Sequence, residues 1–298
     1  MTEASSVYIC RYCRQPSDPS GVACPLCGAP INVAAVVSKS GWQKQPPIKD
    51  MARLQFGQSH VQIEGQQVPT ADFSLAAGES IYFGHHTLLW LDPTTRLQAM
   101  SMAGGWKRML AGLPIIMTQA IGPGHVALSD DHAGEIIALP LSQGQQIWVR
   151  EHRFLAASGN LTYGFTANNV WIQTGSGNDQ KTIYPLGYLG DVFSAQSGQS
   201  LVLLHAPGNT FVRDLAPGET ILVQPTALLY RDVTVQAHLH IEYPRGSGGF
   251  SFFSSRYSYR HVWLRLIGPG RVAMQSVFER EEESEMITGI SPATQQRW

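Results

Sequence analysis

Four cysteines near the beginning of the chain are the residues whose type and spacing most clearly indicate chemistry. Cys10 and Cys13 form one C-x2-C pair, and Cys24 and Cys27 form a second pair ten residues further on. Four thiolates from two such turns satisfy a tetrahedral Zn²⁺ and leave no position open for a substrate, which indicates a structural site. Free thiols or two disulfides are the alternatives, and disulfides do not persist in a reducing compartment.

A second set of candidate metal ligands lies on the strand that we expect from Val233 to Tyr243. Hydrophobic and polar residues alternate there, so His238, His240 and Glu242 share one face. Cupin enzymes bind a metal in this way, although the short spacing between His240 and Glu242 departs from their pattern. Because the apolar face must pack on the core, we expect the histidine face to be solvated or to form an interface. A cupin-like metalloenzyme is the less favoured alternative.

Arginines interleave with aromatic residues in the stretch from Pro244 to Leu266. This composition suits stacking on single-stranded nucleic acid, and it also suits a protein interface. The formal net charge is −1, so the chain has no overall electrostatic footprint for nucleic acid, and we favour the interface. The residues of this candidate surface are Arg245, Phe252, Phe253, Arg256, Tyr257, Tyr259 and Arg260.

The sequence lacks the short motifs that mark common enzyme classes. It contains no G-x-S-x-G, Walker A, G-x-G-x-x-G or H-E-x-x-H motif, so we expect a protein that is not an enzyme. No apolar run approaches the ~20 residues that span a bilayer. No basic and apolar leader precedes the cysteines, and we therefore expect a cytoplasmic protein.

The elements that must position these residues repeat along the chain. A leucine is followed three residues later by a glycine, and then by alternating apolar residues, at the same offsets in three places. The glycine suits a turn with positive φ, and the alternation indicates a half-buried strand. The three copies are Leu75, Gly78, Ile81, Phe83 and Leu88; Leu141, Gly144, Ile147, Val149 and Phe154; and Leu215, Gly218, Ile221, Val223 and Leu228.

A second marker follows each copy. IGPGHVAL begins at Ile121, LGDVFSAQ at Leu189 and IGPGRVAM at Ile267, which makes Gly190 the expected equivalent of Gly122 and Gly268. Two markers that recur in the same order indicate one supersecondary unit used three times.

These patterns predict an all-β protein that carries a small metal module. We expect a four-cysteine zinc ribbon at 1–32, a linker at 33–52, a three-repeat β domain at 53–280 and an acidic, polar tail at 281–298. The repeats should occupy about 53–130, 131–198 and 199–280.

The repeat-bearing residues resemble the AIM twenty-four family, named for altered inheritance of mitochondria. The resemblance rests on the runs GGWKRMLAG, IGPGHVAL, FLAAS, GDVFSAQSG, LAPGETILV and IGPGRVAMQ, and it extends from about Leu54 to Phe278. It implies a fold like that of the tryptophan RNA-binding attenuator protein. In that fold, β-sandwich units of double-stranded β-helix type surround a pseudo-threefold axis. The four-cysteine ribbon lies outside this resemblance.

The preferred hypothesis is a non-enzymatic binding or scaffold protein with a structural Zn²⁺. Its partners would be proteins, and a homo-oligomer is one arrangement that the sequence leaves open. Single-stranded nucleic-acid binding through residues 245–265 is the first alternative, and the cupin-like metalloenzyme is the second.

Overall fold

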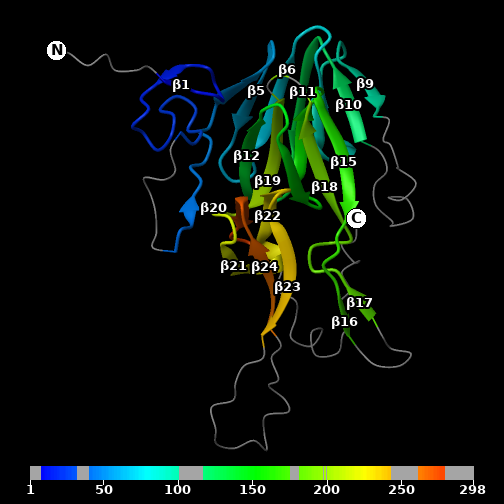
Figure 1. Ribbon diagram of the computed structural model, residues 1–298. Helices are drawn as coiled ribbons and strands as arrows, with labels where there is room; N and C mark the ends of the chain where they lie inside the picture. The colour runs from blue at the N-terminus through cyan, green and yellow to red at the C-terminus, as the bar shows by residue number, and fades with distance from the viewer. Residues whose placement is uncertain are drawn as a thin grey trace, which may run out of the picture.

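The computed structural model describes residues 8–31, 40–100, 117–174, 181–196, 198, 200–242 and 261–278. Strands form almost all the regular structure in these ranges, so the all-β prediction is confirmed (Figure 1). No helix within the described ranges is long and apolar enough to cross a membrane. The candidate surface from Arg245 to Arg260 lies outside the described residues.

The residues that precede the repeats attach to the β body at several points. β1 (Tyr8–Ile9) pairs with β2 (Pro16–Ser17) inside the four-cysteine module. β3 (Gln43–Lys44) lies in the expected linker and pairs with a strand of the third repeat. β4 (Ala52–Phe56) and β5 (Ser59–Glu64) form a hairpin that extends a sheet of the first repeat.

The described part of the first repeat contains six strands, which are β6 (Thr70–Leu75), β7 (Ser80–Gly84), β8 (Leu88–Leu91), β9 (Arg96–Ala99), β10 (Met117–Ile121) and β11 (Gly124–Ser129). They form two small antiparallel sheets. β11 pairs with β6 and β8, while β10 pairs with β7 and β9. A 3-10 turn, η2 (His85–Thr87), connects β7 to β8.

The second repeat has the same pairing. Its strands are β12 (Gly134–Leu141), β13 (Gln146–Arg150), β14 (Phe154–Ser158), β15 (Leu161–Ala167), β18 (Leu189–Ala195) and β19 (Ser200–Pro207). β19 pairs with β12 and β14, while β18 pairs with β13 and β15. An inserted hairpin consists of β16 (Ile172–Thr174) and β17 (Lys181–Ile183).

The third repeat follows the same plan. Its strands are β20 (Thr210–Leu215), β21 (Thr220–Val223), β22 (Leu228–Asp232), β23 (Gln236–Glu242), β24 (His261–Ile267) and β25 (Gly270–Gln275). β25 pairs with β20 and β22, while β24 pairs with β21 and β23. η4 (Pro225–Ala227) occupies the position of η2. The prediction of one unit used three times is therefore confirmed at the level of strand pairing.

Pairing between neighbouring repeats joins them into continuous sheets. β7 pairs with β14, and β13 pairs with β22; we call each of these pairings a joint. They create a six-stranded sheet of order β12-β19-β14-β7-β10-β9 and a seven-stranded sheet of order β15-β18-β13-β22-β25-β20-β3. A five-stranded sheet, β4-β5-β6-β11-β8, and a three-stranded sheet, β21-β24-β23, complete the repeats.

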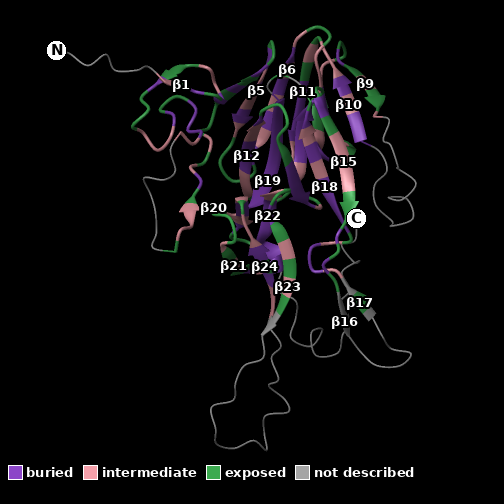
Figure 2. Cartoon of the chain, in the orientation of Figure 1, coloured by how far each residue is buried: buried purple, intermediate pink, exposed green. Residues whose placement is uncertain are grey.

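Three hydrophobic cores connect these four sheets in succession. Phe73 and Leu203 belong to the core between the five- and six-stranded sheets, and Leu204 belongs to the core between the six- and seven-stranded sheets. Val272 and Leu264 belong to the core between the seven- and three-stranded sheets. β19 faces a core on each side, which is why it is buried along its whole length (Figure 2).

The three turn glycines have the conformation that the sequence predicts. Gly78, Gly144 and Gly218 have φ values of 81°, 83° and 77°, and each lies just before the second strand of its repeat. A residue with a Cβ is disfavoured in this left-handed region, so the same requirement explains the same residue type in all three places.

The predicted equivalence of Gly190 with Gly122 and Gly268 is wrong. Gly190 lies inside β18 and faces Arg150 of β13, whereas Gly122 and Gly268 lie in the turn between the last two strands of their repeats. In the second repeat that turn follows Ala195 and lacks the Gly-Pro-Gly sequence. The pairing of β19 places Ser200–Pro207 in the second repeat, beyond the boundary expected at residue 198.

A closed pseudo-threefold arrangement needs a third joint, between β21 and β8. In the described structure both strands are edges of their sheets. Their sheets also lie at opposite ends of the succession of cores. The described strands therefore form two joints between three repeats.

Candidate metal centre and interaction surface

Two equivalent turns position the four cysteines. The amide of Arg14 donates to the carbonyl of Cys10 at 2.8 Å, and the amide of Gly28 donates to the carbonyl of Cys24 at 2.8 Å. Arg14 and Gly28 both have positive φ, 63° and 73°. Each C-x2-C pair thus ends in the same backbone reversal, which turns its two sulfur atoms towards the other pair.

The sulfur atoms have the separations of a tetrahedral metal site. The Sγ atoms of Cys10 and Cys27 are 3.9 Å apart, and those of Cys13 and Cys24 are 3.8 Å apart. A Zn–S distance of about 2.3 Å places two sulfurs of a tetrahedron about 3.8 Å apart. All four sulfur atoms lie within 4.8 Å of one another, so they could bind one metal ion.

The surroundings favour the thiolate form, which a metal requires, at two of the four sulfurs. The pKa of Cys10 and that of Cys24 are lowered, whereas burial raises the pKa of Cys13 and the hydrogen bond with Cys10 raises that of Cys27. A hydrogen bond from Cys27 lowers the pKa of Cys10 to about 5. The Oγ of Ser17 lies 3.1 Å from the sulfur of Cys24, where the hydroxyl can donate to a thiolate. Cys10, Cys24 and Cys27 are buried, and four thiolate ligands would leave no coordination position for a substrate.

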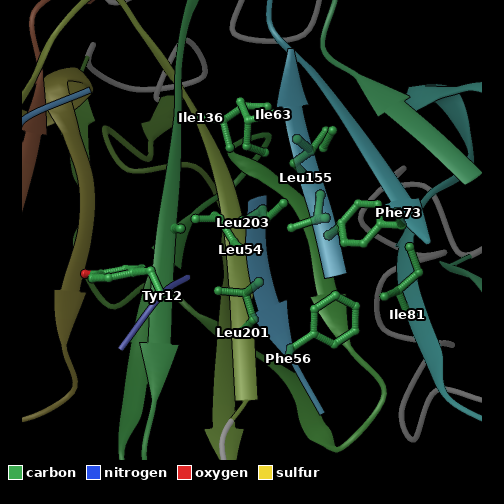
Figure 3. Close-up of a cluster of buried hydrophobic side chains, with 14 of the residues drawn as sticks. Tyr12, Leu54, Phe56, Ile63, Phe73, Ile81, Ile136, Leu155, Leu201 and Leu203 are labelled. Atoms are coloured by element: carbon green, nitrogen blue, oxygen red, sulfur yellow. The ribbon is translucent and has the colours of Figure 1, made fainter. Parts of the chain in front are cut away.

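The four-cysteine module and the β body share one hydrophobic core. Cys10 and Tyr12 belong to the same cluster as Leu54 and Phe56 of β4, and Figure 3 shows Tyr12 at the edge of this cluster. The amide of Gln55 donates to the carbonyl of Tyr12 at 2.8 Å. Burial raises the pKa of Tyr12 to about 12. The module is therefore packed into the fold at β4.

Close packing also explains the glycine after the second cysteine pair. A Cβ at Gly28 would lie 2.7 Å from the carbonyl oxygen of Pro47 and 2.8 Å from the amide of Lys49. That amide donates to the carbonyl of Cys27 at 3.0 Å, and the Nζ of Lys49 donates to the carbonyl of Pro25. The chain after the module thus folds back over the second cysteine-bearing turn.

The histidine strand has the predicted register over part of its length. His238 and His240 of β23 are both exposed, which fits the expected solvated face. They belong to no metal-ligand cluster among the residues whose side chains are described, and the side chain of Glu242 is outside that set. Val233 lies before the strand and is exposed, because β23 begins at Gln236.

A cluster that sequence reasoning missed lies in the turn between β11 and β12. The Nδ1 of His132 is 3.0 Å from Asp130 and 2.5 Å from Asp131. The buried side chain of His205 approaches from β19, with its Nδ1 at 3.5 Å from Asp130. The run Asp-Asp-His is visible in the sequence, but the approach of His205 depends on the pairing of β12 with β19.

Large apolar side chains are exposed on β8 and β21, the two equivalent strands that form no joint in the described part of the chain. Leu89 and Trp90 of β8 are exposed, and so is Leu222 of β21. The strands that form joints, by contrast, have mainly buried side chains. The apolar surface therefore coincides with open edges of hydrogen-bonding backbone.

Comparisons with known proteins place the β body in a family. The family model described as "Mitochondrial biogenesis AIM24" matches residues 61–277. The crystal structure of protein SPYM3_0169 from Streptococcus pyogenes is similar in fold, with a TM-score of 0.54 and 19% identity. That similarity covers 78% of this chain and 97% of the streptococcal chain. The search of curated proteins finds no match.

Proposed function

The chain belongs to the mitochondrial biogenesis AIM24 family, and we propose that it is a non-enzymatic binding or scaffold protein. Its β body would bind protein partners, and its four-cysteine module would hold a structural Zn²⁺. The module begins before the region matched by the family, so it would be an addition to the family fold.

The observation that carries the binding role is the combination of open strand edges with exposed apolar side chains. Among the described strands, β8 and β21 are edges of their sheets, and Leu89, Trp90 and Leu222 are exposed on them. Partners commonly add a strand to such an edge, with main-chain hydrogen bonds for affinity and side-chain contacts for specificity. A patch of this kind on an otherwise folded surface is typical of a protein-binding site.

The proposed Zn²⁺ role rests on the four sulfurs. A site with four thiolate ligands has no free position for a reacting water or substrate, so its contribution would be to folding. The module has little core of its own and shares that of the β body. Zinc would thus fix the two turns that hold Tyr12 against β4.

Photocrosslinking in cells tests the binding role. A photoreactive phenylalanine analogue replaces Trp90 in one variant and Leu222 in another, and Thr162, which is exposed on β15, is the control position. We expect protein adducts from positions 90 and 222 that are absent from position 162. No specific adduct from either position would contradict the proposal.

A turnover assay addresses the absence of catalysis separately. A reaction with a panel of small-molecule substrates that persists after purification, and that is abolished by substitution of His132 or His205, would contradict a non-enzymatic role.

Elemental analysis tests whether the four-cysteine module holds a metal. We expect about one zinc per chain in the wild type. Each of the single variants Cys10→Ser and Cys24→Ser should lose the zinc, and Ser20→Ala should retain it.

A further inference from the structure

The two joints inside the chain are built in one register. In the first joint Ile81 lies opposite Ser158, and Phe83 lies opposite Ala156. In the second joint Ile147 lies opposite Asp232, and Val149 opposite Tyr230. When the repeats are aligned on Leu75, Leu141 and Leu215, these pairs occupy the same positions. Both joints therefore use the same positions of the repeat unit in the same register.

β8 has the local geometry of the strands that form joints. A β-bulge interrupts β8, β14 and β22 at the same repeat position, which is occupied by Leu89, Leu155 and Leu229. The carboxylate of Asp92 accepts the amide of His125, as that of Asp232 accepts the amide of Arg271. β8 thus has the shape that allows pairing with the second strand of another repeat, but no such strand pairs with it among the described residues.

Burial differs sharply between the open strands and their equivalents. The bulge leucines Leu155 and Leu229 are 1% and 0% exposed, whereas Leu89 is 52% exposed. Leu155 points into the first core, among side chains from several strands (Figure 3). A joint buries this leucine in the core of the preceding repeat, and the described residues provide no such core for Leu89.

The opposite edge shows the same contrast. Tyr82 and Trp148 in the joint-forming second strands are each 1% exposed, whereas Leu222, their equivalent in β21, is 44% exposed. Tyr82 belongs to the core of the second repeat, and Trp148 belongs to the core of the third. The residue at this position thus packs into the repeat that follows, and for Leu222 no following repeat is present among the described residues.

We propose that β21 of one copy of this chain pairs antiparallel with β8 of a second copy and forms the third joint between molecules. The inference rests on the proposed function and names its partner. Extension of the shared register places Ile221 opposite Asp92, Leu222 opposite Leu91 and Val223 opposite Trp90. Leu89 of the second copy then enters the core of the third repeat.

A second copy fits better than closure within one chain. The sheets that contain β8 and β21 lie at opposite ends of the succession of cores. The two edges are different surfaces, so the contact is heterologous, and repeated use gives a ring or an open chain of copies. Pairing within one chain would require the terminal sheets to meet.

Disulfide trapping between two single variants tests the contact and its register. Leu91→Cys and Leu222→Cys proteins are purified separately, mixed and oxidised, and the wild-type chain, with its four ribbon cysteines, measures background. We expect a covalent dimer in the mixture that is absent from wild type and from a mixture of Arg96→Cys with Leu222→Cys. Arg96 is exposed on β9, away from the proposed joint.

Solution mass provides an independent readout. We expect the wild-type chain to be oligomeric, and a Trp90→Arg, Leu222→Lys double variant to be a folded monomer, because both side chains are exposed. The inference is overturned if wild type is monomeric. It is also overturned if Leu91→Cys and Leu222→Cys cross-link only when both are in one chain. Cell adducts to a different protein at position 90, with a monomeric chain, would preserve the proposed function and remove this inference.

Discussion

The packing of Trp148 explains why a glycine is required at position 190 on the neighbouring strand. Trp148 on β13 is buried, and the guanidinium of Arg231 stacks over its ring at 5.2 Å. Burial lowers the pKa of Arg231 to about 10, and the stacking gives this buried cation a favourable contact. On the neighbouring strand the indole occupies the space that a side chain at Gly190 would need.

Gly190→Ala should therefore destabilise the fold. The new Cβ would lie 2.0 Å from the Nε1 of Trp148, so the indole or the strand must move, at a cost of about 1–3 kcal/mol. Gly164→Ala is the matched control, because a Cβ at Gly164 on β15 has no neighbour within 4 Å. Urea denaturation measures both variants. Equal unfolding free energies for the two would contradict the steric account.

His205 should make stability depend on pH. Burial lowers its pKa below the ordinary value of 6.5, the charge of Asp130 opposes this shift, and the charge of Arg153 reinforces it. The unfolded chain therefore takes up a proton before the folded chain does, and the free energy of unfolding falls as the pH drops below about 6.5. The contribution is constant above that pH, where both states are neutral at this residue.

The measurement compares urea denaturation of wild type and His205→Leu between pH 7.5 and pH 5. We expect wild type to lose more stability on acidification than His205→Leu does. His240→Gln, at an exposed position, should keep the wild-type dependence. A His205→Leu variant with the full wild-type loss would assign the pH dependence to other groups.

At the scale of the element, the turn before each second strand allows the cost of backbone conformation to be measured without a contribution from packing. A Cβ at Gly144 would meet no atom within 4 Å, so the only cost of Gly144→Ala is its φ of 83°. We expect a loss of about 1 kcal/mol in unfolding free energy. Gly144→Asn should lose less, because asparagine tolerates this conformation. If alanine and asparagine have the same effect, left-handed strain is not the cause.

The turns were predictable because they depend on residues close in sequence. The offsets around Gly78, Gly144 and Gly218 state a local rule, and so does the spacing of the four cysteines. The boundary of the second repeat was not predictable in the same way. LGDVFSAQ has a glycine near its start, as the other markers do, but strand pairing assigns Leu189–Ala195 to one unbroken strand.

The candidate sites also differ in whether they depend on residues close in sequence or on distant strand pairing. The four cysteine sulfurs that could hold a metal come from two local turns, and their grouping follows from sequence spacing. The approach of His205 to Asp130 and the open edges at β8 and β21 depend on partners far away in the chain. Periodicity does not distinguish β21, which forms no joint in the described structure, from β7 and β13, since all three second strands carry apolar residues at the same offsets.

At the scale of the whole molecule, the packing of the four-cysteine module on the β body determines how much of the fold should lose stability when the metal is removed. An independent appendage would unfold alone when the metal is removed. Here Tyr12 is buried in the core that includes Leu54 and Phe56, and its carbonyl accepts the amide of Gln55. Loss of the module would expose one face of that core, at a cost of about 1.5–3 kcal/mol for each large side chain uncovered. The β body should therefore weaken first at β4.

Chelation followed by hydrogen exchange tests this coupling. We expect the amide of Gln55 to lose protection when the metal is removed, because its acceptor belongs to the module. The amides of β24 and β25 should keep their protection, since these strands surround a different core. Tyr12→Ala with metal bound is the matched control, and it should weaken β4 without loss of the metal. Unchanged protection at Gln55 after chelation would show that the module is independent. Simultaneous loss at β4 and β25 would show that all three cores unfold as one cooperative unit with the metal as its common support.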